Sequence, residues 1–203
     1  ANSVIALRVL GYGDDHPKFA EAIRKLTELE IDEGDSIRVQ PCLSPIWDTA
    51  LAMNALHDAG TAPDHPRLTS AARWLASKEA RRSGDWHLRK PGIEASGWYF
   101  QFNNEFYPDV DDTAAVLMAL KRVAPGSVEG GEEAVRRGFE WSRSLPCSNG
   151  GWAAFDVDVD HEILTKVPFA DHNAMLDPAC ADITGRMLEM FGHFPELRER
   201  EDV

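Results

Sequence analysis

Two kinds of apolar pattern alternate along the chain, and both repeat at helical spacing. Segments of the first kind open with a polar cap and are apolar on nearly every face. They are WDTALAMNAL at 47–56, DDTAAVLMAL at 111–120 and the weaker DITGRMLEMF at 182–191. Segments of the second kind are amphipathic, and a Gly-Trp element follows each of them. They are RLTSAARWLASKE around Trp74, before GDW at 84–86, and EEAVRRGFEWSRSL around Trp141, before GGW at 150–152.

Only the inner of two concentric helical layers loses contact with water, so this alternation predicts an all-α fold. We expect an α/α barrel, or toroid, whose inner helices are apolar all round and whose outer helices are amphipathic. We expect Trp74, Trp86, Trp98, Trp141 and Trp152 to serve packing, as aromatic side chains commonly do in cores.

Strand signals are sparse, and WYFQF at 98–102 is the main extended candidate. Pro108 disfavours helix at Tyr107, so the helix that follows is expected to begin inside or after residues 109–112. The first 38 residues hold one amphipathic helix, DHPKFAEAIRKLTEL, and then an acidic loop before two prolines break the chain. We therefore place a domain boundary between residues 1–38 and 39–203.

Charge and composition narrow the function classes. The formal net charge of -13 argues against a nucleic-acid partner, which needs clustered Lys and Arg. Cys42, Cys147 and Cys180 are odd in number and lack a C-x-x-C spacing, so they predict neither a disulfide framework nor a zinc site. No run approaches the ~18 apolar residues of a membrane span. The start has neither a basic leader nor an initiator Met, and we expect the chain to be an internal stretch of a longer protein.

The densest group of carboxylates lies in PDVDDTA at 108–114, directly before the apolar run AAVLMAL. Asp109, Asp111 and Asp112 fall within four positions, and like charges this close do not all ionise easily. At least one is expected to keep its proton near neutral pH, as a general acid requires. Helix capping is the alternative explanation, because Asp is favoured at N-caps and in first turns.

The chain resembles the bacterial squalene–hopene cyclases, a family of class II triterpene cyclases. QPCLSPIWDTA, GDWHLRKPG, GWYFQFNNEFYPDVDDTA, NGGWAAFDVD and DHEILTKVPFADH carry the resemblance, in this order. The Trp-ended segments are similar to the family's Gln-Trp repeats, although Leu145-Pro146 stands where a hydrophobic residue and Gln are usual. That difference is expected to cost a hydrogen bond between outer helices, about 1 kcal/mol. The resemblance implies that residues 1–38 end the second helical barrel domain and that 39–203 form the first half of the catalytic one.

The resemblance also implies an activity: cyclisation of squalene or a related polyprene to hopene or diplopterol. Asp111 would be the general acid that protonates the terminal alkene, with Asp109 and Asp112 as its supporting carboxylates. No cofactor or metal is implied. The resemblance also implies a peripheral, monotopic location on the cytoplasmic face of the bacterial cell membrane. We further expect a homodimer for the full-length form.

Two more groups of residues take roles from the resemblance. Asp182 and Arg186 lie four apart on a helical segment beside the acid, where some cyclases carry a His in place of Arg186. A guanidinium does not lose its proton, so we expect a fixed charge that tunes Asp111, or else a simple pair within the helix. The expected cavity residues are the aromatic side chains Trp47, Phe100 and Phe155, the polar neighbour Gln101, and Phe169 at the substrate entrance. Phe155 stands where some members have Tyr, and core packing is the alternative for each aromatic residue.

Other functions remain open on the residues alone. An α/α barrel glycoside hydrolase would also use a carboxylate pair, but the apolar run that follows the acidic motif favours a hydrocarbon substrate. A prenyltransferase-like subunit needs a zinc site that the sequence does not offer. The isolated chain could also be a non-catalytic helical scaffold, since part of a barrel exposes helices made for burial. The alternating acids of DVDVDHE at 156–162 lack the spacing of a calcium loop, and we expect a solvated loop there.

Overall fold

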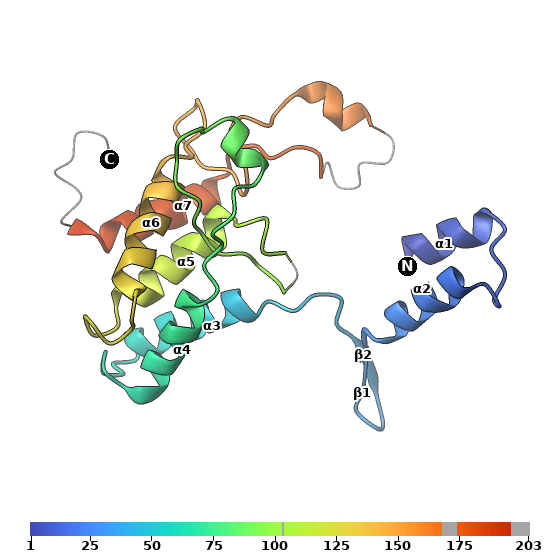
Figure 1. Ribbon diagram of the computed structural model, residues 1–203, viewed down its shortest axis with the longest axis horizontal. Helices are drawn as coiled ribbons and strands as arrows, with labels where there is room; N and C mark the ends of the chain where they lie inside the picture. Colours follow the sequence, from blue (N-terminus) through green and yellow to red (C-terminus); the bar gives the residue numbers. More distant parts are fainter. Residues whose placement is uncertain (103, 168–173, 196–203) are drawn as a thin grey trace. The chain divides into compact units, whose positions relative to one another are not determined.

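Helices dominate the chain, as the apolar pattern predicts. The computed structural model describes residues 1–102, 104–167 and 174–195. These residues form seven α-helices, two short 3₁₀ helices and one two-stranded hairpin (Figure 1). The chain divides into two compact units, Ala1–Leu43 and Ser44–Val203, and each is described by itself.

The first unit contains two helices and a hairpin. Helix α1 (Asn2–Val9) packs against α2 (Pro17–Thr27), and β1 (Glu30–Asp32) pairs antiparallel with β2 (Ile37–Val39). The expectation of a single helix followed by an acidic loop was therefore wrong here. The acidic residues instead form the hairpin turn, in which Gly34 has φ +91°, a value that glycine adopts at little cost.

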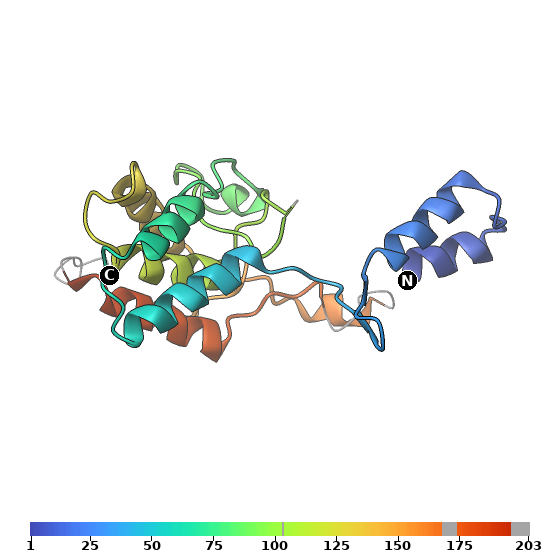
Figure 2. The same cartoon turned by 90° about the horizontal axis from the view of Figure 1, so that it is seen from below.

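The second unit has two layers of helices around α5 (Val110–Lys121). Helices α3 (Pro45–Asp58) and α7 (Ala181–Gly192) flank α5 in one layer, and α4 (Pro66–Ala76) and α6 (Gly131–Arg143) cover its other side. Figure 2 shows α4 and α6 on one side of the unit and α3 and α7 on the other. The apolar segments are the inner helices and the amphipathic ones the outer helices, so the expected all-α architecture of layered helices is confirmed.

Helix α5 is the interior element of this arrangement. Ten of its twelve residues are buried, and Asp111 is one of the two that are not. The flanking helices bury only a stripe each, and they leave Leu51 of α3 and Leu188 of α7 39% and 62% exposed. Helix α5 therefore has neighbours on all sides, whereas α3 and α7 lie at the edges of the inner layer.

Tryptophan side chains join the two layers. Trp98 and Trp141 are fully buried, and the Trp98 indole N–H donates to the carbonyl of Leu75 at 2.7 Å. Trp86 packs edge-on against Trp141, with 5.9 Å between the ring centroids. The packing role expected for these three is confirmed. The segment at 98–102 is not a strand, however, because Trp98 forms only an isolated bridge, with Asp109.

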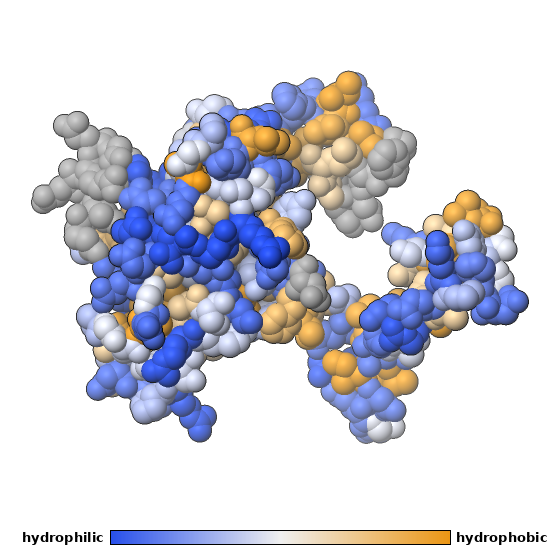
Figure 3. Space-filling model, in the orientation of Figure 1, coloured by the Kyte–Doolittle hydropathy of each residue, from blue (hydrophilic) through white to orange (hydrophobic). Residues whose placement is uncertain are grey.

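Two short helices carry apolar side chains on the surface of the second unit. Leu88 ends the 3₁₀ helix η1 (Asp85–Leu88) and is 85% exposed, and Ile163 in η2 (Glu162–Lys166) is 73% exposed. Figure 3 shows hydrophobic surface over the η2 segment. These positions belong to connections between helices rather than to the core.

Candidate active site

The acidic cluster lies at the first turn of α5. Asp109 is the N-cap: its Oδ1 accepts a hydrogen bond from the backbone N–H of Asp112 at 2.7 Å. Its own N–H donates to the carbonyl of Trp98 at 2.9 Å. Capping therefore explains where Asp109 stands, as the preference for Asp at this position predicts.

A close backbone approach holds the preceding segment against this turn. Gly97 has φ +107°, and a Cβ there would lie 2.9 Å from Cβ of Pro108 and 3.0 Å from Oγ1 of Thr113. The N–H of Trp98 donates to the same Thr113 hydroxyl at 2.9 Å. Only glycine fits both the conformation and the space, so Gly97 allows the backbone to cover the acidic turn.

Two of the three carboxylates are shielded from water. Asp109 is 5% exposed and Asp112 is 3% exposed. Burial raises the pKa of Asp109 well above its usual range, and the neighbouring charge of Asp112 raises it further. Burial also raises the pKa of Asp112 to about 6, although a hydrogen bond with Asp109 and the charge of Arg186 oppose the change.

The pair formed by Asp109 and Asp112 therefore holds a proton near neutral pH. Oδ1 of Asp112 is buried and has no hydrogen-bond partner among the described residues. An unpartnered buried oxygen is costly for a carboxylate and less so for a carboxylic acid. A retained proton was expected from crowding of the three acids, but the main physical cause is burial.

Asp111 is the carboxylate that reaches the surface, with 30% of its side chain exposed. Nε of Arg186, on α7, donates to Oδ1 of Asp111 in an ion pair. The guanidinium carbon of Arg186 also lies 5.0 Å from the ring centroid of Trp47, on α3. Three inner helices thus bring an acid, a fixed cation and an aromatic face together at one end of the unit.

Asp182 does not share this arrangement. It is exposed at the start of α7, and a side-chain hydrogen bond from Cys180 is the main reason that its pKa is lowered, with Arg186 contributing least. The ion pair of Arg186 crosses from α7 to α5 instead of running along α7. The simple helix pair that the spacing allowed is therefore not the main interaction of Arg186.

The remaining cavity candidates lie on connecting segments. Phe100 and Phe155 are 38% and 45% exposed, and Gln101 is half-buried. Phe100 and Gln101 belong to the segment between Trp98 and the acidic turn, and Phe155 belongs to the loop after α6. Phe169 lies outside the described residues.

One residue of this region carried no signal in the sequence. Asp177 lies before α7, and its carboxylate binds the backbone of the loop that carries Phe155. An isolated Asp before a proline is commonplace in turns, and its contacts are more than twenty positions away. Spacing along the chain could not have identified it.

The family model of the squalene–hopene cyclase C-terminal domain matches residues 43–203. The chain belongs to this family. Its relatives include the squalene–hopene cyclases of Zymomonas mobilis, 42% identical over 199 residues, and Alicyclobacillus acidocaldarius, 39% identical over 194 residues. A dammaradiene synthase of the fern Dryopteris crassirhizoma is 40% identical over 190 residues.

These matches cover 94%, 95% and 94% of the chain, respectively, but only 30%, 30% and 28% of the relatives. The chain thus spans less than a third of the curated cyclases that it matches. Within the part that the structure describes, no helix is both long and apolar enough to cross a bilayer. No group of three or more His, Cys, Asp and Glu in that part could hold a metal ion.

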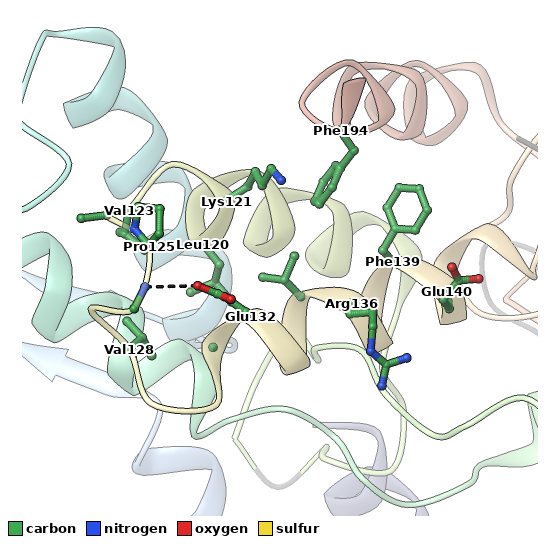
Figure 4. A pocket seen from close by; sticks show the side chains of 14 residues that line it. Leu120, Lys121, Val123, Pro125, Val128, Glu132, Arg136, Phe139, Glu140 and Phe194 are labelled. Atoms are coloured by element: carbon green, nitrogen blue, oxygen red, sulfur yellow. Dashed lines mark hydrogen bonds between the residues drawn. The ribbon is translucent and has the colours of Figure 1, made fainter. Parts of the chain in front are cut away.

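The second unit also has a pocket that lies away from the three acids. It has a volume of about 640 Å³ and lies between the end of α5, the segment 123–126 that follows it, most of α6 and Phe194. Figure 4 shows Phe139 and Phe194 on one side of it, and on the other Glu132, which accepts a hydrogen bond from the N–H of Gly126 at 3.2 Å. Leu120, at its wall, is roughly 14 Å along the helix axis from Asp111. This pocket therefore contributes nothing to the acidic cluster.

Proposed function

We propose that the chain carries the acid-bearing part of a triterpene cyclase. The enzyme protonates the terminal alkene of squalene, or of a related polyprene, and so starts ring closure toward hopene or diplopterol. One observation carries the proposal: the buried carboxyl pair of Asp109 and Asp112 lies directly beside Asp111, the carboxylate that reaches the surface. Membership of the squalene–hopene cyclase family supports the substrate class.

The charge of the cluster explains how a group in an ion pair acts as an acid. Three carboxylates and one guanidinium carry a net charge of -2 when all are ionised, and two protons neutralise the set. An apolar guest that displaces water favours the neutral set, because charges lose hydration there. In the resting form of that set, Asp109 and Asp112 hold the two protons and Arg186 balances the charge of Asp111. In the reactive form, the proton of Asp112 has moved to Asp111, Asp109 donates a hydrogen bond to the ionised Asp112, and Arg186 balances the charge of Asp112.

The proton then passes from Asp111 to the alkene. The O–H bond breaks, the π electrons form the new C–H bond, and the positive charge moves to the neighbouring carbon. Arg186 keeps its proton and holds the Asp111 carboxylate that remains. Loss of a proton from the final cation gives hopene, and addition of water followed by loss of a proton gives diplopterol.

The aromatic candidates act after protonation. Trp47, Phe100 and Phe155 would stabilise the carbocations through their ring faces, by about 0.5 to 2 kcal/mol each. Gln101 would hold a water, and Phe169 would line the entrance. The position of Trp47 over the guanidinium of Arg186 supports its place beside the acid.

The setting of the whole enzyme is part of the proposal. We place it as a peripheral, monotopic protein on the cytoplasmic face of the bacterial membrane, where its substrate dissolves, and as a homodimer. The exposed apolar side chains of Leu88 and Ile163 support an apolar partner surface. The 203-residue chain by itself is expected to be inactive, because Asp111 is partly open to water in it.

The test is Asp111→Asn in the full-length protein that carries this chain. An amide does not protonate an alkene, so hopene formation, measured by gas chromatography, is expected to fall at least about 100-fold. The unfolding midpoint should change little, because Asp111 is the partly exposed member of the cluster. Normal hopene output from the variant would refute the assignment. Release of sugars from oligosaccharides without turnover of squalene would replace it by the glycoside hydrolase alternative.

A further inference from the structure

The carboxylate of Asp177 binds three consecutive backbone N–H groups of another loop. Oδ1 accepts from the N–H of Ala154 at 3.0 Å, and Oδ2 accepts from Phe155 at 2.7 Å and Asp156 at 2.9 Å. Hydrogen bonds to a charged acceptor are stronger than those between neutral groups. We call this set of contacts the Asp177 clamp. It fixes the backbone on both sides of Phe155.

The same two segments are joined at either side of the clamp. The N–H of Asp177 donates to the carbonyl of Val159 at 2.7 Å, and the N–H of Cys180 donates to the carbonyl of Trp152 at 3.0 Å. The N–H of Trp152 in turn donates to Oγ1 of Thr184 at 2.9 Å. The loop that carries Phe155 is thus attached to the first turn of α7, the helix that also carries Arg186.

The clamped loop also touches the acidic turn directly. The carbonyl of Ala154 accepts a hydrogen bond from the N–H of Val110 at 2.8 Å. Val110 is the first residue of α5 and stands between Asp109 and Asp111. The peptide groups around Ala154 therefore bind Asp177 on one side and the start of α5 on the other.

We infer that Asp177 is a positioning residue for the cyclisation reaction. The Asp177 clamp fixes the position of Phe155 relative to the carboxyl group of Asp111. It also fixes the first turns of α5 and α7 relative to each other. Asp177 itself does not touch the substrate. This inference rests on the proposed function, since the ring of Phe155 matters only if it faces a cation that Asp111 creates.

Asp177→Asn is the most direct perturbation. The side chain keeps its size, but one accepting oxygen becomes an NH₂ group that faces backbone N–H donors. In the 203-residue chain, we expect amide hydrogen exchange of residues 154–156 to become about 10-fold faster or more. Exchange within α6, and within α5 beyond its first turn, should stay as in the wild type, because those residues keep their own hydrogen bonds within the helix.

Asp158→Asn is the matched control. Asp158 lies in the same loop, but its Oδ1 accepts from the N–H of Ser148, at 2.8 Å, outside the clamp. This variant should leave exchange at residues 154–156 unchanged. Asp177→Glu keeps both oxygens one methylene further out and is expected to restore part of the protection. It also serves as the second variant if Asp177→Asn does not fold, as judged by tryptophan fluorescence.

Activity is measured separately, in the full-length protein with squalene. A positioning role predicts that Asp177→Asn lowers kcat about 10-fold and changes the ratio of products, while KM changes less. Unchanged exchange at residues 154–156 would show that the clamp is wrong. Faster exchange with wild-type kcat and product ratio would overturn the positioning role. If the wild-type protein itself does not turn over squalene, the proposed function fails, and the exchange data still decide whether the clamp exists.

Discussion

Replacing Asp112 by asparagine tests whether burial keeps a proton in the acidic cluster. Asp112→Asn preserves the shape of the side chain but removes the group that ionises. Burial raises the pKa of Asp112 from 3.8 to about 6 in the folded chain. A raised carboxyl pKa stabilises the folded state fully at pH values below 3.8, and this contribution is lost as the pH rises through about 6. Because the asparagine side chain does not ionise, Asp112→Asn does not lose stability in this way as the pH rises.

The size of the effect follows from the two pKa values. The gap between 3.8 and about 6 corresponds to at most about 3 kcal/mol in the free energy of unfolding. Proton linkage predicts that about 1.4 kcal/mol of this stabilisation is lost between about pH 5 and about pH 8, and that the rest is lost at lower pH. Asp109 and Asp112 titrate as a pair, so the measured difference belongs to the pair. We therefore expect the free energy of unfolding of Asp112→Asn to rise by about 1.4 kcal/mol relative to that of the wild type between about pH 5 and about pH 8.

Tryptophan fluorescence during urea unfolding is a suitable assay. All six tryptophans lie in residues 44–203, so the signal reports the second unit alone. Asp64→Asn, at an exposed carboxylate before α4, is the control and should follow the wild type at every pH. Unfolding free energies of the wild type and Asp112→Asn that run parallel from pH 5 to 8 would refute the argument from burial.

Three further substitutions test the packing and the cation. Gly138→Ala places a Cβ 2.8 Å from Cζ3 of Trp98 and is expected to destabilise the second unit by about 1 to 3 kcal/mol. Gly185→Ala, on α7, adds a Cβ that would meet no described atom within 4 Å apart from the neighbouring backbone of its own helix, and it should stabilise the unit by up to about 1 kcal/mol. The same urea assay measures both, and equal effects would contradict the close packing of α6 on Trp98. Arg186→Gln removes a charge that lowers the pKa of Asp112, so the pH optimum of cyclisation in the full-length protein should rise; an unchanged pH profile leaves Arg186 with a packing role only.

The sequence by itself determined the helices of the second unit and the position of the acidic cluster along the chain. Helix formation depends on residues three and four positions apart, so the apolar period identified the inner and outer helices directly. The acidic motif and its helix start were also visible, because an N-cap is a local feature. Short-range patterns failed where the structure depends on turn geometry, as in the hairpin at residues 30–39 and the bridge at Trp98.

Only the tertiary structure decided which acid keeps a proton and which partner Arg186 takes. A pKa depends on water removed by neighbouring helices, and those neighbours come from distant parts of the chain. Arg186 had an acid four positions away in Asp182, yet its ion pair is with Asp111, 75 positions away. That choice depends on how α7 turns its face toward α5, and the contacts of Asp177 likewise depend on two loops meeting in space. Packing between helices fixes such contacts, and a pattern along one helix does not contain them.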